Sequence, residues 1–150
     1  MSTSARIAVA LGPLLGVLLL AGCGGSGDGT AEAAVDTPAC LASLTPTAVP
    51  KDGSFPEDWP FPDGTVVTGT EQVPGGGLAV TAQVGAEFNQ VLPFMQHDLE
   101  DAGFVATKGE AERDDAEATW AGHGWSGTWA IKESETCKGT TLLQVAAVEQ

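Results

Sequence analysis

Two adjoining stretches decide the predicted fold: TVVTGTEQVPGGGLAVTAQV, residues 65–84, and AEFNQVLPFMQHDLEDAGF, residues 86–104. The first contains two strand-like runs. Residues 65–73 are rich in Val and Thr, and apolar and polar residues alternate over 78–84. The glycines at 75–77 separate these runs and predict a loose hairpin turn. We therefore expect two antiparallel strands, the second with one buried face.

The second stretch predicts an amphipathic helix over residues 86–102. Its apolar side chains recur at spacings of three and four, at Phe88, Val91, Leu92, Met95 and Leu99. Gly103 stands just past the helix end, where a left-handed backbone favours glycine, and Phe104 is expected to pack back on the last turn. Pro93 removes one intrahelical hydrogen bond, so we expect the helix to kink or restart there.

The chain after the helix predicts more strands, at residues 104–108, 117–122, 127–133 and 140–149. The expected domain, residues 38–150, is α+β. It has a single antiparallel sheet of about five strands in ββαβββ order, with three or four strands after the helix and the helix packed on one face.

Five carboxylates crowd the segment EAERDDAE, at Glu110, Glu112, Asp114, Asp115 and Glu117. Calcium prefers oxygen ligands of this kind, but the segment lacks the spacing of a calcium loop and Arg113 would repel a cation. A solvated hairpin loop is the better interpretation, and no metal site is predicted.

Residues 50–64, PKDGSFPEDWPFPDG, combine four prolines with Phe55, Trp59 and Phe61. Proline fixes φ and removes a hydrogen-bond donor, which predicts irregular chain. Two interpretations remain open: an arm that packs its aromatic rings on the core, or one wall of a peptide-binding groove.

The N-terminus carries an export pattern. After Arg6, residues 7–20 are uncharged, and a helix of that length spans about 21 Å, less than the roughly 30 Å of a bilayer core. This predicts a signal peptide rather than a membrane-spanning helix. The residues that follow, Leu20-Ala21-Gly22-Cys23, resemble the lipobox of bacterial lipoproteins.

The resemblance implies that residues 1–22 are removed and that Cys23 carries the lipid that anchors the chain. Residues 23–37 then form the lipidated Cys23 and a flexible tether, since GGSGDGT cannot bury a core. The mature region is also loosely similar to small bacterial surface lipoproteins of uncharacterised function, through Phe94, Leu99 and Gly103 and through Gly127 and Trp129. That similarity implies a fold class only.

With Cys23 lipidated, Cys40 and Cys137 remain. An exported chain reaches an oxidising compartment, so the pair predicts a disulfide that closes a loop of about 100 residues. The alternative is two unpaired buried thiols.

The segment WAGHGWSGTW, residues 120–129, is the most distinctive of the mature chain. Its glycines predict a hairpin with Trp120 and Trp129 paired across it and Trp125 at its end. In a second interpretation Trp120, His123, Trp125 and Trp129 form a candidate ligand surface for sugar or protein. Ser126 lacks the G-x-S-x-G spacing of a serine-hydrolase elbow, and no catalytic residue is assigned.

The net charge of −14 argues against nucleic acid as a partner and against electrostatic binding to anionic lipid. The leading hypothesis is a non-enzymatic binding or accessory module without a cofactor. It is anchored through Cys23 on the extracytoplasmic face of the membrane and has an envelope protein or the cell wall as partner. The alternatives are a small envelope hydrolase with His97 or His123 as base, and a structural, wall-associated acidic protein.

Overall fold

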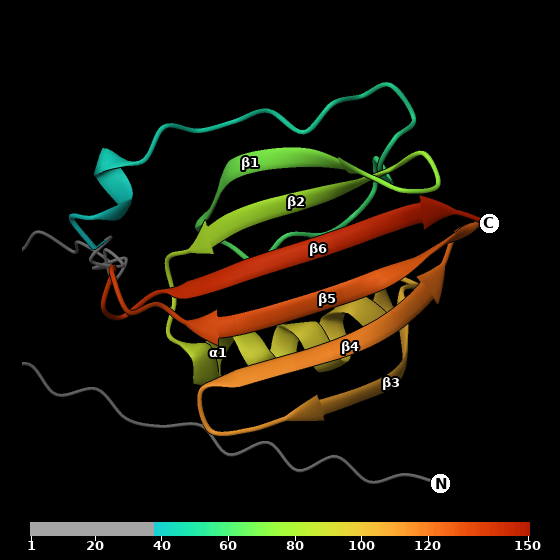
Figure 1. The fold of residues 1–150 in the computed structure, drawn as a ribbon. Helices are drawn as coiled ribbons and strands as arrows, with labels where there is room; N and C mark the ends of the chain where they lie inside the picture. Colours follow the sequence, from blue (N-terminus) through green and yellow to red (C-terminus); the bar gives the residue numbers. More distant parts are fainter. Residues whose placement is uncertain (1–37) are drawn as a thin grey trace, which may run out of the picture. The chain divides into compact units, whose positions relative to one another are not determined.

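The computed structural model describes residues 38–150, which Figure 1 draws in colour. The predicted signal peptide (1–22) and the predicted lipidated Cys23 with its tether (23–37) lie outside the described residues. Within the described part, no helix combines the length and the apolar character that crossing a membrane requires.

Six strands form one antiparallel sheet in the order β1-β2-β6-β5-β4-β3 (Figure 1). They are β1 (Thr65–Val73), β2 (Gly77–Val84), β3 (Val105–Ala111), β4 (Asp115–Gly122), β5 (Trp125–Glu133) and β6 (Thr141–Glu149). A single antiparallel sheet with one helical segment is confirmed, and so is the Gly-rich β1–β2 hairpin.

The expected count of about five strands, in ββαβββ order, is wrong, because four strands follow the helix. The weakest strand signal lay in the acidic segment. There β4 starts at Asp115, and its alternate residues Ala116, Ala118 and Trp120 are buried. Burial of that apolar face outweighs the charge of the residues between them, so the chain extends where a longer loop was expected.

The C-terminal strand β6 lies in the middle of the sheet. It pairs with β2 on one side and with β5 on the other, in unbroken register. The β1–β2 hairpin and the β3–β4–β5 meander therefore belong to one sheet only because β6 joins them.

The helical segment has three parts: α1 (Phe88–Pro93), a π-helical turn η2 (Phe94–Asp98) and α2 (Leu99–Asp101). The predicted irregularity at Pro93 is confirmed and takes the form of the π turn. Because Pro93 has no N–H, the α-helical hydrogen-bond ladder is interrupted there. Val91, Met95 and Leu99 nevertheless all remain 1% exposed.

The helix ends as predicted. Gly103 has φ +90°, its N–H donates to the Glu100 carbonyl at 2.9 Å, and the Phe104 N–H donates to the Leu99 carbonyl at 2.9 Å. This pair of bonds is a Schellman motif. It reverses the chain so that Phe104, which is 1% exposed, enters the core just before β3.

The helix covers one face of the sheet, here called the helix face. Alternate strand residues point into it and form the main hydrophobic core with the helix. They are Leu78, Val80, Ala82 and Val84 of β2, Leu143, Val145 and Ala147 of β6, Trp129 and Ile131 of β5, and Ala116, Ala118 and Trp120 of β4.

The proline-rich arm packs on this core, which confirms the first of its two interpretations. Phe55 and Trp59 are 2% and 5% exposed. The Trp59 ring lies 4.9 Å from that of Phe104 and 4.6 Å from that of Trp120, between ring centroids. Aromatic pairs at such distances stabilise beyond the area that they bury.

The predicted disulfide between Cys40 and Cys137 is confirmed, with a Cα–Cα distance of 5.7 Å. It ties the start of the described chain to the β5–β6 loop. That loop is held from within by Thr140, whose hydroxyl donates to the Cys137 carbonyl at 2.5 Å and accepts the Gln83 amide at 2.6 Å. The sequence pattern did not reveal this buried network.

Candidate functional site

His123 forms the tip of the β4–β5 hairpin. It has φ 53° and is followed by Gly124 at φ 81°, a left-handed pair suited to a tight two-residue turn. Its Nδ1 lies 3.3 Å from Oδ2 of Asp58, and its Nε2 lies 3.0 Å from the carbonyl oxygen of Ala102. The ring also lies 4.8 Å from that of Phe104. The imidazole thus joins the hairpin tip to the helix end and to the arm.

These contacts do not assemble a catalytic group. A general base needs a nitrogen that can accept a proton from the nucleophile, and both nitrogens of His123 already have partners. Ser126 pairs with Ala121 and Val148, on the face opposite the helix. His97 is exposed on the π turn. The structure therefore brings neither histidine together with Ser126.

The candidate tryptophan surface is not a surface. Trp120 and Trp129 are 2% and 3% exposed and belong to the core, and Trp125 is half-buried against it. The expected pairing across the hairpin is also wrong, since Trp120 lies opposite Gly127 and Trp129 lies opposite Ala118. The two-residue turn at His123 and Gly124 sets this register, which places the two tryptophans diagonally rather than directly opposite each other. Of the four proposed residues, only His123 is exposed.

The indole N–H groups of Trp59, Trp120 and Trp129 have no hydrogen-bond partner among the described residues. Their rings contribute volume and aromatic contacts to the core rather than polar recognition.

The acidic segment forms the β3–β4 hairpin, with the Glu112 N–H donating to the Asp115 carbonyl at 2.8 Å. The predicted hairpin is present, but its loop is shorter than expected, because Glu110, Asp115 and Glu117 lie on the strands. In residues 38–150 no three His, Cys, Asp or Glu side chains gather as a metal site would require.

The side of the sheet away from the helix, here called the open face, is the largest feature that sequence reasoning missed. Rows of side chains cross it from strand to strand. One row runs Glu110, Glu117, Ala130, Gln144, Thr81, Gly69, and the next runs Lys108, Thr119, Thr128, Ala146, Ala79, Glu71. The middle of both rows consists of small or neutral residues.

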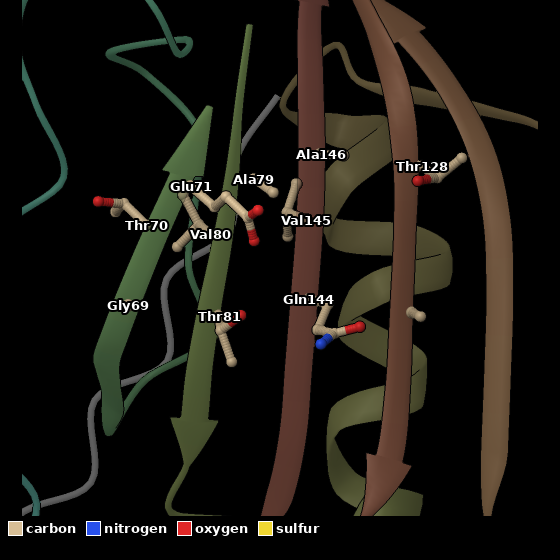
Figure 2. Close-up of a pocket in the computed structure, with 11 residues that line it drawn as sticks. Gly69, Thr70, Glu71, Ala79, Val80, Thr81, Thr128, Gln144, Val145 and Ala146 are labelled. Atoms are coloured by element: carbon tan, nitrogen blue, oxygen red, sulfur yellow. The ribbon is translucent and has the colours of Figure 1, made fainter. Parts of the chain in front are cut away.

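These two rows line a shallow trough made of two hollows. The first, of about 350 Å³, is lined by Glu71, Ala79, Thr81, Gln144 and Ala146, among others (Figure 2). The second, of about 370 Å³, is lined by Lys108, Glu110, Glu117 and Thr119, among others. Thr128 and Ala130 line both, so the trough crosses all six strands.

Figure 2 shows how polar groups are arranged in the first hollow. The Glu71 side chain leaves the edge strand β1 and extends over β2 toward β6. The Gln144 amide and the Thr128 hydroxyl also stand on this side of the sheet, and the helix lies behind the strands. The trough thus offers a carboxylate, an amide and hydroxyls above a floor of alanine methyl groups.

No protein-family model, no curated protein and no solved structure matches this chain. The geometry of the open face therefore carries the functional interpretation.

Proposed function

We propose that the chain is a bacterial lipoprotein that holds a non-enzymatic binding module on the extracytoplasmic face of the membrane. Cys23 carries the lipid, residues 24–37 form the tether, and the open face of the sheet is the surface that binds an envelope protein or the cell wall. The lipobox Leu20-Ala21-Gly22-Cys23 supports the anchoring.

The disulfide supports export. Disulfides persist in oxidising compartments and are rare in the cytosol. The two cysteines other than Cys23 are joined to each other, which leaves Cys23 as the thiol for lipidation.

The observation that carries the binding role is the trough across the open face. Sheets that are packed on one side only usually present charged and polar residues to water on the other. Here the centre of the open face instead carries Ala79, Ala130 and Ala146 between Thr and Gln side chains. Such a surface desolvates at low cost and still offers hydrogen-bonding groups.

The anchor is tested by feeding an alkyne-bearing fatty acid to cells that make the chain. We expect label on the wild type and none on a Cys23→Ser variant, which should be released or remain unprocessed. Absence of label on the processed wild type would contradict the proposal.

The surface is tested with a photoreactive benzophenone side chain placed at Thr128, in the trough, or at Glu100, exposed on the helix. In intact cells we expect crosslinked products of discrete mass from position 128 and none from position 100. Equal crosslinking from both positions, or none from position 128, would show that the open face is not the binding surface.

A further inference from the structure

We propose that the trough binds an extended segment of a basic polypeptide that lies across the strands. One cationic side chain pairs with Glu71 at one end, and another pairs with Glu110 and Glu117 at the other end. This inference rests on the proposed function of the open face and adds to it the chemical class of the ligand.

The length of the trough matches a short extended peptide. Glu71 lies on β1 and Glu110 lies on β3, the two edge strands of the sheet. Five spacings of about 4.8 Å separate these strands, which gives roughly 24 Å. An extended chain rises about 3.3 Å per residue, so eight residues place their first and last Cα atoms about 23 Å apart.

The charges favour a basic ligand. Glu110 and Glu117 lie directly opposite each other on neighbouring strands, an arrangement of like charges that destabilises a sheet. Within residues 38–150, neither of them nor Glu71 forms an ion pair with a Lys or Arg. Lys108 is the one cation lining the trough among the described residues, and it lies in the row beside Glu110. A ligand cation between Glu110 and Glu117 would relieve their repulsion, and the net charge of −14 attracts basic chains from a distance.

The floor favours a peptide over a sugar. Thr81, Gln144 and Thr128 offer hydroxyl and amide groups that can bond to peptide N–H and C=O groups. Sugar rings stack on exposed aromatic side chains. Trp129, the one aromatic residue lining the trough in the described part of the chain, is only 3% exposed.

The free edge of β3 is a poorer place for a peptide. Val105–Ala111 is exposed along its whole length, but its register with β4 shifts between Ala106 and Lys108. A bulge and a lysine are features that prevent a sheet edge from pairing with another strand.

The inference is tested by fluorescence anisotropy with the purified full chain and the labelled peptide Lys-Thr-Ala-Thr-Ala-Thr-Ala-Lys. The matched control peptide has both lysines replaced by Gln. We expect the lysine peptide to bind at least about fivefold more tightly than the control, since an exposed ion pair contributes up to about 1 kcal/mol.

Four variants locate the binding. We expect Glu71→Gln and the double variant E110Q/E117Q each to lower the affinity for the lysine peptide by about fivefold. The exposed helix variant Glu100→Gln should leave this affinity unchanged. The double variant removes a like-charge repulsion, so we expect it to be at least as stable as the wild type, and its urea unfolding curve checks this. Thr128→Trp should obstruct the floor of the trough and lower the affinity for the lysine peptide and the control peptide alike.

Equal binding of the lysine peptide and the control peptide would overturn the inference. A loss of binding in Glu100→Gln equal to that in Glu71→Gln would also overturn it, because it would indicate general attraction to an acidic protein. If neither peptide binds while position 128 still crosslinks in cells, the basic-peptide inference fails and the proposed function stands. If position 128 does not crosslink, the proposed function itself fails.

Discussion

The imidazole of His123 bridges two segments that lie far apart in the chain, with Nδ1 3.3 Å from the Asp58 carboxylate and Nε2 3.0 Å from the Ala102 carbonyl. His123, the base of the alternative hydrolase hypothesis, is thereby a structural clasp between the hairpin tip, the helix end and the proline-rich arm.

We expect His123→Asn to lower the free energy of unfolding by about 1 kcal/mol, since Asn tolerates the positive φ but loses the ring contacts. His123→Ala should cost about 1 kcal/mol more, because alanine resists a left-handed backbone. Urea unfolding measures both. Asp58→Asn, which alters only the exposed contact with His123, should change stability by less than about 1 kcal/mol. If His123→Asn left stability unchanged but abolished an envelope hydrolase activity, the clasp interpretation would be wrong.

Removal of the disulfide should destabilise the domain strongly. Cys40 and Cys137 are 97 residues apart, and closing a loop of that length stabilises by up to about 4–5 kcal/mol through the entropy of the unfolded chain. We expect C40S/C137S to unfold at a much lower urea concentration than the wild type. Addition of a reductant should shift the wild type toward the double variant and leave the double variant unchanged. If the wild type gave identical unfolding curves with and without reductant, the disulfide would not stabilise the domain as predicted.

Two glycines of the same hairpin should respond very differently to alanine. A Cβ at Gly127 would collide with the Ala146 carbonyl and approach the Trp120 ring, so we expect Gly127→Ala to cost more than about 2 kcal/mol. At Gly124 a Cβ meets no atom of residues 38–150 within 4 Å, and the φ of 81° is what opposes it. Gly124→Ala should therefore cost about 1 kcal/mol. Thermal unfolding measures the stability of both variants. A larger loss in Gly124→Ala than in Gly127→Ala would contradict this account.

The buried hydroxyl of Thr140 should matter more than its methyl group. Thr140→Val leaves the Gln83 amide and the Cys137 carbonyl without their partner, and we expect a loss of about 2–3 kcal/mol. Thr140→Ser keeps the hydroxyl and should cost about 1 kcal/mol for the missing methyl. Equal losses in the two variants, measured by urea unfolding, would mean that packing rather than hydrogen bonding holds the loop.

A change at the like-charge pair on the open face, Glu110 and Glu117, should affect stability and peptide binding in opposite directions. Glu110→Lys converts the Glu110–Glu117 repulsion into an attraction, and we expect a gain of about 0.5–1 kcal/mol in the free energy of unfolding. The same variant should bind the lysine peptide more weakly than the wild type. A variant that is destabilised, or that binds the peptide more tightly, would contradict both the electrostatic account of this pair and its role in the trough.

Local sequence pattern was sufficient to predict two elements. Alternation at residues 78–84 and the three-and-four spacing from Phe88 to Leu99 predicted β2 and the helix, because each pattern places apolar groups on one side of a regular backbone. The glycine at 103 predicted the helix end, because a left-handed residue is needed there.

The errors arose where a residue's role depends on its neighbours in the sheet. Trp120 and Trp129 stand at the two ends of the segment 120–129, which suggested that they pair across the hairpin. The register instead sets each of them opposite a small residue, and both are buried. The trough was not foreseen for the same reason. Glu71, Gln144 and Glu117 come from three strands, and nothing in their local sequence indicates that they share a face.

Local sequence alone thus determined the helix, its break at Pro93 and its end at Gly103. The resemblance to a lipobox, which sets Cys23 apart, led to the predicted pairing of the two other cysteines. These properties depend on backbone preference, side-chain periodicity and the count of thiols. Only the tertiary structure decided that His123 joins the hairpin tip to the helix end, that Trp120 and Trp129 belong to the core and that the open face carries a trough. Those properties depend on strand order and register, which are set by contacts between residues far apart in the chain.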